Sequence, residues 1–206
     1  MELSIITVTY NPGTKIAEQV RSVILGCGDM PFEHIIVDNG STDGTVEPLR
    51  KGFPQVRIIP NSKNRGFGRA NNQGVELATG KFFLFLNPDM RVEPDSLKKM
   101  VEWMRQRPDV GIAGCKLTRP DGSFNADAAP RRFPKLCEAV VIILKLPHIF
   151  PSLLNRYLMK DFDPNKEQEV DSVRGAFMLV RPALVKQLGW AFDPRYFIWF
   201  EDVDLC

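Results

Sequence analysis

The sequence predicts an α/β domain with a mostly parallel central sheet and helices on both of its faces. Short, continuously apolar segments recur along the first half of the chain, as is typical of parallel strands buried on both sides. Segments with helical spacing of apolar residues lie between them. Polar clusters follow several of the apolar segments, and in such sheets ligands bind beyond the carboxyl ends of the strands.

Five apolar segments are predicted as strands because they are rich in β-branched and aromatic residues. Turn formers close three of them, as Asn-Pro-Gly, Asn-Gly-Ser and Asn-Pro-Asp. The predicted strands are residues 3–9, 34–38, 56–60, 81–86 and 110–114.

Three segments between these strands are predicted as helices. Residues 16–24 carry apolar side chains near helical spacing, and residues 66–78 follow a glycine-rich turn. Residues 94–107 open with Pro94 and Asp95, which suit the first turn of a helix.

The regular alternation stops after Pro120. Residues 120–123, Pro-Asp-Gly-Ser, predict a hairpin turn. We expect residues 131–168 to be helical or irregular, residues 170–180 to contain another strand, and residues 183–188 to form a short helix.

Composition indicates one globular domain. Of the 206 residues, 44% are hydrophobic, which excludes a disordered chain, and 27 basic against 25 acidic residues are too balanced for a nucleic-acid protein. The four cysteines are too far apart for a zinc or redox motif. Since the first residues lack the features of a signal peptide, we expect a cytoplasmic protein with free thiols.

The most apolar stretch, residues 139–154, is too short and too often interrupted by Pro and Lys to span a bilayer. Its central part, residues 140–150, leaves two alternatives. One is an ordinary core helix, and the other is a segment that rests on a membrane surface.

An acidic cluster at residues 201–204 is the first candidate for catalysis. Glu201, Asp202 and Asp204 follow an aromatic stretch, and like charges this close raise the pKa of one carboxyl unless a cation relieves them. Such a cluster suits a general base, and a solvated helix start is the alternative.

Asn87 and Asp89 end a predicted strand and offer two oxygen ligands for a hard divalent cation. The Gly-Phe-Gly-Arg turn at residues 66–69 has neither P-loop nor GxGxxG spacing. This excludes a kinase, a P-loop NTPase and a dinucleotide-binding protein. No GxSxG nucleophile motif occurs.

Taken together and in order, six motifs resemble family 2 glycosyltransferases, most closely the bacterial rhamnosyltransferase-type branch. The resemblance covers nearly the whole chain and implies a GT-A fold with a Rossmann-like, mostly parallel sheet. The motifs are TVTYN at residues 7–11, VDNGSTDGT at 37–45, NRGFGRANN at 64–72, FLNPD at 85–89, GAFMLVR at 175–181 and FEDVDLC at 200–206.

The resemblance assigns the nucleotide-sugar site to the first half of the chain. Asp38 matches the acid that accepts a hydrogen bond from the pyrimidine of the donor. Thr7 and Tyr10 match the strand end that lines the nucleoside pocket. The loop and helix beside the base and diphosphate are matched by Arg65, Gly66 and Asn71.

The resemblance also assigns a metal site and a base. Asp89 matches the last acid of the Asp-x-Asp motif, which binds Mg²⁺ or Mn²⁺ on the diphosphate. Asn87 replaces the first acid of that motif, so a weaker metal affinity is expected. Asp202 matches the catalytic base of inverting members, and Glu201 matches a supporting or acceptor-contacting position.

We therefore expect an inverting transferase that moves a sugar from a dTDP- or UDP-sugar, such as dTDP-rhamnose, to a saccharide or lipid-linked glycan in cell-surface polysaccharide synthesis. The expected single domain, 1–206, has a donor half at 1–115 and an acceptor half at 116–206. We expect the acceptor half to be incomplete at its C-terminal end. The chain by itself is therefore expected to bind the donor nucleotide even if it does not transfer the sugar. Arginines at 131, 132 and 174 are candidates for contacting a phosphate or saccharide. The alternatives are a nucleotide-sugar-binding module without catalysis and a nucleotidyltransferase. No nucleic-acid partner is expected, and a cytoplasmic location at the inner face of the membrane would suit a lipid-linked acceptor.

Overall fold

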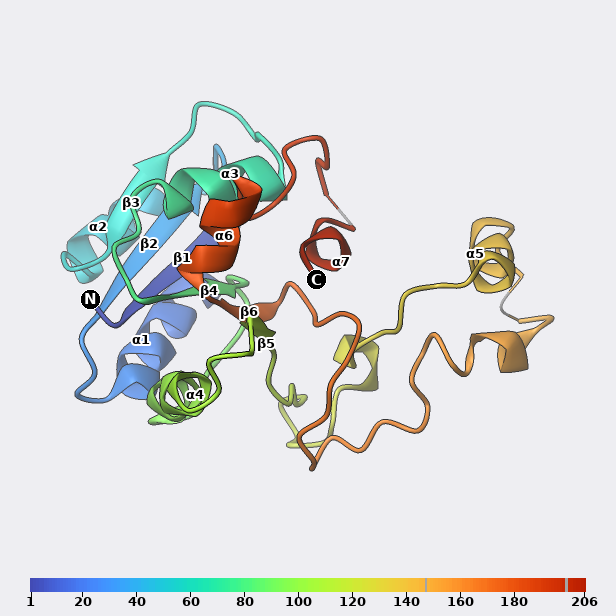
Figure 1. The fold of residues 1–206 in the computed structure, drawn as a ribbon. Helices are drawn as coiled ribbons and strands as arrows, with labels where there is room; N and C mark the ends of the chain where they lie inside the picture. The colour runs from blue at the N-terminus through green and yellow to red at the C-terminus, as the bar shows by residue number, and fades with distance from the viewer. Residues whose placement is uncertain (147, 199) are drawn as a thin grey trace.

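A computed structural model describes residues 1–206 except 147 and 199. Its strands form one sheet in the order β3-β2-β1-β4-β6-β5 (Figure 1). The strands are β1 (Leu3–Thr9), β2 (Phe32–Asp38), β3 (Arg57–Pro60), β4 (Phe82–Leu86), β5 (Ile112–Ala113) and β6 (Phe177–Val180).

The sheet is mostly parallel, as predicted. β1 pairs in parallel with β2 and with β4, and β3 pairs in parallel with β2. β6 runs antiparallel to both of its neighbours, β4 and β5. Because β6 comes from the second half of the chain and lies between two strands of the first half, both halves share one sheet.

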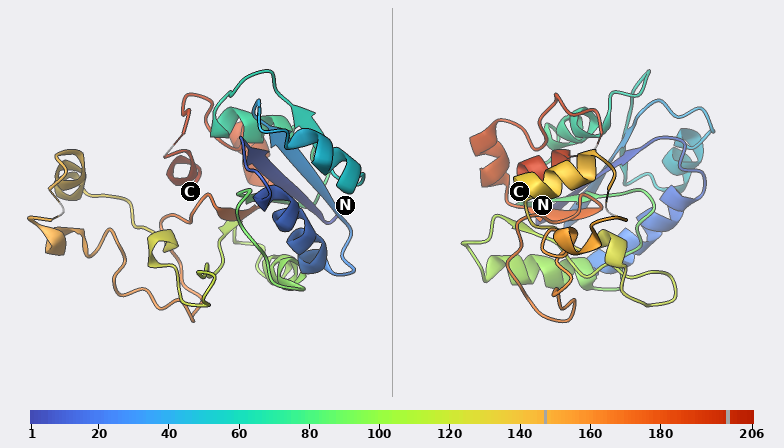
Figure 2. Two further views of the ribbon diagram at one scale, coloured as in Figure 1. Left: turned by 180° about the vertical axis from the view of Figure 1, so that it is seen from behind. Right: turned by 90° about the vertical axis from the view of Figure 1, so that its right-hand side faces the viewer.

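Helices cover both faces of the sheet, which confirms the predicted class (Figures 1 and 2). The helices are α1 (Lys15–Cys27), α2 (Val46–Gly52), α3 (Phe67–Val75), α4 (Ser96–Arg105), α5 (Leu136–Ile143), α6 (Pro182–Leu188) and α7 (Glu201–Leu205). Two 3-10 turns, η1 (Ala126–Ala128) and η2 (Pro151–Leu154), lie in the second half. The predicted hairpin turn at 120–123 is confirmed by the antiparallel bridge between Thr118 and Phe124.

Alternation along the strands explains the two layers of core. Leu3 and Ile5 pack with residues of α1 and α4, whereas Ile6 packs with residues of α3 and α6 on the opposite face. Successive side chains of a strand point to opposite faces, so an unbroken apolar strand supplies both cores. α2 packs on α1 through Leu49 and Phe53, so α1, α2 and α4 share one face.

Residues 131–168 form an arm that stands away from the sheet (Figures 1 and 2). α5 and η2 lie in this arm and contact each other. Leu136 and Ile143 are 83% and 75% exposed, so the expectation of an ordinary core helix at 140–150 is wrong. The physical reason is that, among the described residues, α5 has its main contacts with η2 and not with the helices or strands of the main sheet.

Gly74 marks the closest approach between α3 and β1, and we predict that Gly74→Ala destabilises the protein. A Cβ atom at Gly74 would lie 2.5 Å from Cγ2 of Ile6, which is fully buried. Such overpacking costs about 1–3 kcal/mol of the free energy of unfolding. Urea denaturation measures the loss. In the control Gly52→Ala, where nothing lies within 4 Å, stability should stay equal or rise.

Candidate active site

The loops that follow β1 and β2 interlock at the carboxyl end of the sheet. The backbone N–H of Asn11 donates to Oγ of Ser41 at 2.9 Å, and the N–H of Thr42 donates to Oδ1 of Asn11 at 2.8 Å. The N–H of Gly13 donates to Oδ2 of Asp43 at 2.9 Å. The structure thus brings together the first two predicted polar clusters, and it leaves Tyr10 half exposed beside them.

Thr7 belongs to a polar group that is buried beneath α1. Its side chain is fully buried, and its Oγ1 lies 2.9 Å from Nε2 of Gln19 and 3.0 Å from Nε2 of His34. Thr7 shares the strand face of Leu3 and Ile5, which α1 covers. Gln19 also donates to the carbonyl of Asn87 at 3.1 Å, so this buried group positions the end of β4.

His34 makes stability dependent on pH. Burial lowers the pKa of His34 to about 3 from an ordinary value of 6.5. Between these two values the unfolded chain binds a proton that the native state excludes, so the free energy of unfolding should fall as the pH falls from 6.5. For each pH unit below 6.5, the equilibrium constant for folding should fall about tenfold. Urea titrations from pH 7 to about pH 5 test this. His34→Gln should flatten the slope, and His148→Gln, at an exposed position, should keep it.

Asp38 is buried at the end of β2 and already holds a turn. Its Oδ2 accepts from the backbone N–H of Ser41 at 3.0 Å, and its Oδ1 accepts from Oγ of Ser41 at 2.5 Å. A carboxylate offers about four acceptor sites, so it can still accept one N–H from a ligand. The turn fixes the direction in which this acceptor points.

Asn39 organises the next loop, although the sequence alone gave no reason to select it. It is buried, and its Nδ2 donates to Oδ1 of Asn64 at 3.0 Å and to the carbonyl of Gly66 at 3.1 Å. Its Oδ1 accepts from the N–H of Arg65 at 3.1 Å. This side chain thereby holds the Asn-Arg-Gly turn against the end of β2.

Gly66 lies where the chain leading to the acidic cluster packs on α3. Its φ is +88°, and a Cβ there would lie 2.6 Å from the carbonyl oxygen of Phe197. The same carbonyl accepts from the N–H of Phe67 at 2.8 Å. Glycine is therefore required for backbone conformation and for close approach. Asn71, by contrast, is buried in α3 and donates to the carbonyl of Phe67.

A basic hollow opens beside this contact. It has a volume of about 390 Å³ and is lined by Lys63, Asn64, Arg65, Arg69, Pro194, Arg195 and Phe197. Arg195 is paired with Asp193, and Nε of Arg69 donates to the carbonyl of Pro194. The remaining basic side chains, Lys63 and Arg65, suit an anionic ligand.

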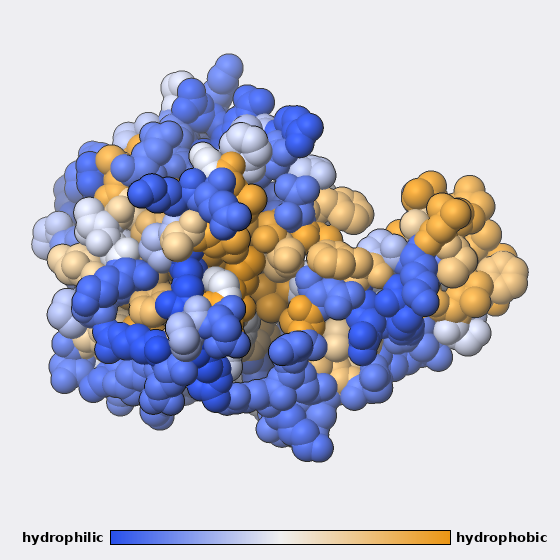
Figure 3. Space-filling model, viewed as in Figure 1, coloured by the Kyte–Doolittle hydropathy of each residue, from blue (hydrophilic) through white to orange (hydrophobic). Residues whose placement is uncertain are grey.

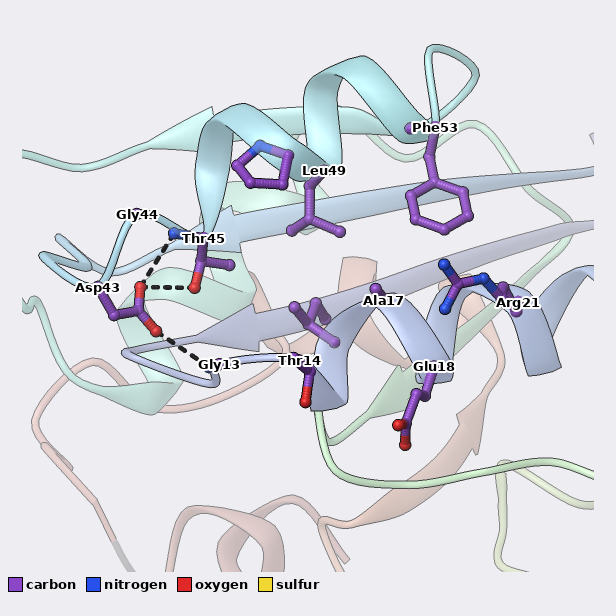
Figure 4. Close-up of a pocket in the computed structure, with 13 residues that line it drawn as sticks. Gly13, Thr14, Ala17, Glu18, Arg21, Asp43, Gly44, Thr45, Leu49 and Phe53 are labelled. Atoms are coloured by element: carbon purple, nitrogen blue, oxygen red, sulfur yellow. Dashed lines mark hydrogen bonds between the residues drawn. The ribbon is translucent and has the colours of Figure 1, made fainter.

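A larger hollow of about 560 Å³ lies between α1 and α2 (Figure 4). Leu49 of α2 and Phe53, which follows this helix, face Ala17 and Arg21 of α1 across it. Asp43 closes one end through its bonds to Gly13 and Thr45. None of the predicted donor, metal or catalytic residues lines this hollow, which adjoins the interlocked loops through Gly13 and Asp43.

Asn87 and Asp89 follow β4, with Asn87 half-buried and Asp89 exposed. Within the described part of the chain, no three His, Cys, Asp or Glu side chains gather as a metal cage. One carboxylate and one amide oxygen instead fit a cation that takes most of its ligands from a bound diphosphate, as Mg²⁺ commonly does.

Gly175 and Ala176 connect the end of β4 to the acidic cluster. The N–H of Gly175 donates to Oδ2 of Asp202 at 3.0 Å, and the N–H of Asn87 donates to the carbonyl of Ala176 at 3.1 Å. A Cβ at Gly175 would lie 3.2 Å from Cβ of Asp202. Two consecutive residues therefore hold the candidate base beside the candidate metal ligands.

The predicted raised pKa within the acidic cluster falls on Glu201. Glu201 is buried, and burial, followed by the nearby charge of Asp202, raises the pKa of its carboxyl. Asp202 is half-buried, and its Oδ1 also accepts from the N–H of Val203 at 2.9 Å. Asp204 points into solvent, which leaves Asp202 as the positioned carboxylate of the three.

Two of the three candidate arginines lie close together near this point. Arg131 and Arg174 both donate to the carbonyl of Asp127, at 3.5 and 2.7 Å. Burial, followed by the charge of Arg174, lowers the pKa of Arg131. Arg174 precedes Gly175, so this pair of cations adjoins the residue that bonds Asp202.

Comparison with known proteins identifies relatives along the whole chain. Residues 4–188 match the family described as Glycosyl transferase family 2. The N-acetylglucosaminyl-diphospho-decaprenol L-rhamnosyltransferase of Mycobacterium tuberculosis is 31% identical over 216 residues, covering 98% of this chain and 68% of that protein. The putative teichuronic acid biosynthesis glycosyltransferase TuaG of Bacillus subtilis is 34% identical over 125 residues, covering 59% of this chain and 49% of that protein.

Two solved structures share the fold at low sequence identity. The crystal structure of S. aureus TarS 1-349 has a TM-score of 0.67 at 20% identity and covers 98% of this chain. The mannosyltransferase PcManGT from Pyrobaculum calidifontis, in complex with GDP-Man and Mn²⁺, has a TM-score of 0.67 at 21% identity and covers 99% of this chain. This chain spans about half of each, 53% and 50%. The predicted GT-A fold is confirmed.

The sheet, the polar residues at its carboxyl edge and these relatives define a glycosyltransferase. The match over residues 4–188 identifies the glycosyltransferase family to which this chain belongs. The chain belongs to glycosyl transferase family 2 and resembles a rhamnosyltransferase of that family.

Proposed function

We propose that this protein transfers a sugar with inversion from a nucleoside-diphosphate donor to a hydroxyl group of an acceptor. The observation that supports this most is the pair of hydrogen bonds made by Gly175 and Ala176, which hold Asp202 beside the end of β4. Inversion needs a base on one side of the sugar and a leaving group on the other. We assign Asp202 as the base and Asp89 to the diphosphate side.

In this mechanism Asp202 takes the proton of the acceptor hydroxyl as that oxygen attacks the anomeric carbon. Backbone N–H groups of Gly175 and Val203 each bond one of its oxygens, so the carboxylate is held in one orientation. Buried Glu201, whose pKa is raised, supports the same helix start and is assigned a positioning role.

The donor nucleotide is proposed to lie across the ends of β1 and β2. Asp38 accepts a hydrogen bond from the N–H of a pyrimidine, and half-exposed Tyr10 covers one side of the nucleoside. Arg65, beside the turn that Asn39 holds, reaches the diphosphate from the basic hollow. UDP- and dTDP-sugars are the donors that this arrangement favours, and dTDP-rhamnose is the candidate that the mycobacterial relative suggests.

Asp89, with the amide oxygen of Asn87, would hold Mg²⁺ or Mn²⁺ against the donor diphosphate. When bound, such a cation neutralises charge on the departing nucleoside diphosphate. A solved structure of the same fold was obtained with a nucleotide sugar and Mn²⁺.

The acceptor is proposed to be a lipid-linked glycan of cell-surface polysaccharide synthesis, by analogy with the relative that acts on a diphospho-decaprenol. Residues 1–115 then carry most of the donor side and residues 116–206 most of the acceptor side. We assign Arg131 and Arg174 to contact an acceptor phosphate, which the closeness of Arg174 to the Gly175–Asp202 bond supports. Such an acceptor assigns the enzyme to the cytoplasmic face of a membrane. No helix among the described residues is long and apolar enough to cross a bilayer.

A thermal-shift screen with nucleotides tests the donor assignment. UDP or dTDP with Mn²⁺ should raise the Tm of the chain, by mass action on the native state, more than GDP does. Asp38→Ala should remove the preference, while Asp109→Ala, at an exposed carboxylate before β5, should keep it. A clear preference for GDP would contradict the role given to Asp38, and binding without any transfer of labelled sugar would indicate a binding module.

A further inference from the structure

The arm carries an apolar face that nothing in the described structure covers. Leu136, Val140, Ile143 and Leu144 are all exposed and follow the i, i+4, i+7, i+8 spacing of one helix face. Ile149, Phe150 and Leu153 extend this face beyond α5. We call these seven side chains the apolar face of the arm. Figure 3 shows the hydrophobic surface gathered at the tip of the arm, away from the sheet.

The arm has its own small structure behind this face, so the exposed positions are fixed. Val141 and Leu154 are buried where α5 meets η2. Arg156 bonds both oxygens of Glu138, at 3.0 and 2.6 Å, and it also donates to the carbonyl of Phe133. The ion pair faces inward, and the apolar face therefore points outward.

The charge of the arm selects the kind of partner. The arm as a whole, residues 131–168, contains seven Lys or Arg and four acids. Its part that carries the apolar face, residues 131–160, contains six of these basic residues and one of the acids, Glu138, which is paired with Arg156. Lys135, Lys145 and Lys160 are exposed, and the first two adjoin Leu136 and Leu144 in the sequence. Two copies of the basic stretch 131–160 facing each other would repel. An anionic lipid surface accepts both the cations and the apolar side chains.

We propose that the apolar face of the arm inserts into the interface of an anionic bilayer, with Lys135, Lys145 and Lys160 contacting lipid phosphates. The proposed lipid-linked acceptor would explain why the protein binds a membrane, and the inference rests on that proposed function in this respect alone. It extends the proposed function by naming the surface that binds the membrane. It requires neither nucleotide nor acceptor, so it is tested separately from sugar transfer.

Vesicle flotation of the 206-residue chain tests the proposal. The chain should float with phosphatidylcholine vesicles that contain about 30% phosphatidylglycerol, and much less with phosphatidylcholine alone. Raising the salt to about 0.5 M should weaken the electrostatic part. Leu144→Glu should weaken partitioning about tenfold or more, because it places a charge at the interface. Lys145→Glu should weaken it about fivefold or more on anionic vesicles alone.

Matched variants on the main body serve as controls. Leu25 on α1 is 60% exposed and Leu144 is 59% exposed, so Leu25→Glu makes the same change at the same exposure. Lys186→Glu on α6 is the control for charge. Both should float like the parent chain and keep its thermal shift with nucleotide. Equal flotation with neutral and anionic vesicles would overturn the proposal. So would a Leu144→Glu variant that floats normally, or a dimer in sedimentation velocity that Leu144→Glu dissociates.

Discussion

Asp202→Asn should lower the rate of sugar transfer about a hundredfold to ten-thousandfold, the contribution of a positioned general base. An amide of nearly the same shape cannot accept the proton of the acceptor hydroxyl. Its carbonyl oxygen can still accept the N–H of Gly175, which bonds Asp202 at 3.0 Å, whereas its amide nitrogen cannot accept the N–H of Val203, so one of the two bonds that hold the side chain is kept. Turnover of labelled nucleotide-sugar measures the rate, and calorimetry measures donor affinity, which should not change.

Asp204→Asn is the matched control, since Asp204 lies in the same short helix and is exposed. It should transfer at nearly the parent rate. Full transfer by Asp202→Asn with intact donor binding would falsify the assignment of the base. A loss of both transfer and donor affinity would instead indicate that the substitution disturbs the contact between α7 and the Gly175 turn.

Asp89→Ala should lower metal-dependent transfer about a hundredfold, because it removes the carboxylate proposed to hold the cation on the diphosphate. With a single carboxylate at the site, Mn²⁺ should bind appreciably only when a nucleoside diphosphate supplies further oxygen ligands. Asn87→Asp adds a second carboxylate and should raise the affinity for Mn²⁺ about tenfold. Titration of Mn²⁺ with and without UDP measures both effects.

The control for Asp89→Ala is Asp109→Ala, which removes an exposed carboxylate that precedes β5. It should leave the Mn²⁺ titration unchanged. If Asp89→Ala retains metal-stimulated transfer, the cation is held elsewhere. If Asn87→Asp binds Mn²⁺ no better, the amide side chain does not face the diphosphate.

The parallel strands were predictable because they are nearly continuous apolar runs, which leave few other structures open. α2 was not predicted, since it has seven residues of which one, Leu49, is buried, and so small an apolar face gives a weak periodic signal. β6 is shorter than the predicted strand because residues 170–176 leave the sheet. The turn at Gly175 in that segment bonds Asp202.

The site was predictable in part. Asp38, Asn87 and Asp89 end their strands as expected, and the loops around Asp38 interlock as the shared edge of a parallel sheet requires. Thr7 and Asn71 face inward because strand alternation and helix spacing turn them towards packed neighbours. The strand and helix periodicities that bury Thr7 and Asn71 can be read from the sequence. The hydrogen bonds of buried Asn39 cannot, because they depend on the loop around Asn64 folding back onto it.

The sequence by itself determined the fold class, the family and the polar residues at the strand ends, since these follow from local patterns. Only the tertiary structure decided that Asp202 meets the end of β4 through Gly175 and Ala176, because that contact joins segments far apart in the chain. It also decided that the apolar face of the arm is exposed. Periodicity shows that a helix has an apolar face, but what lies against that face is set by long-range packing.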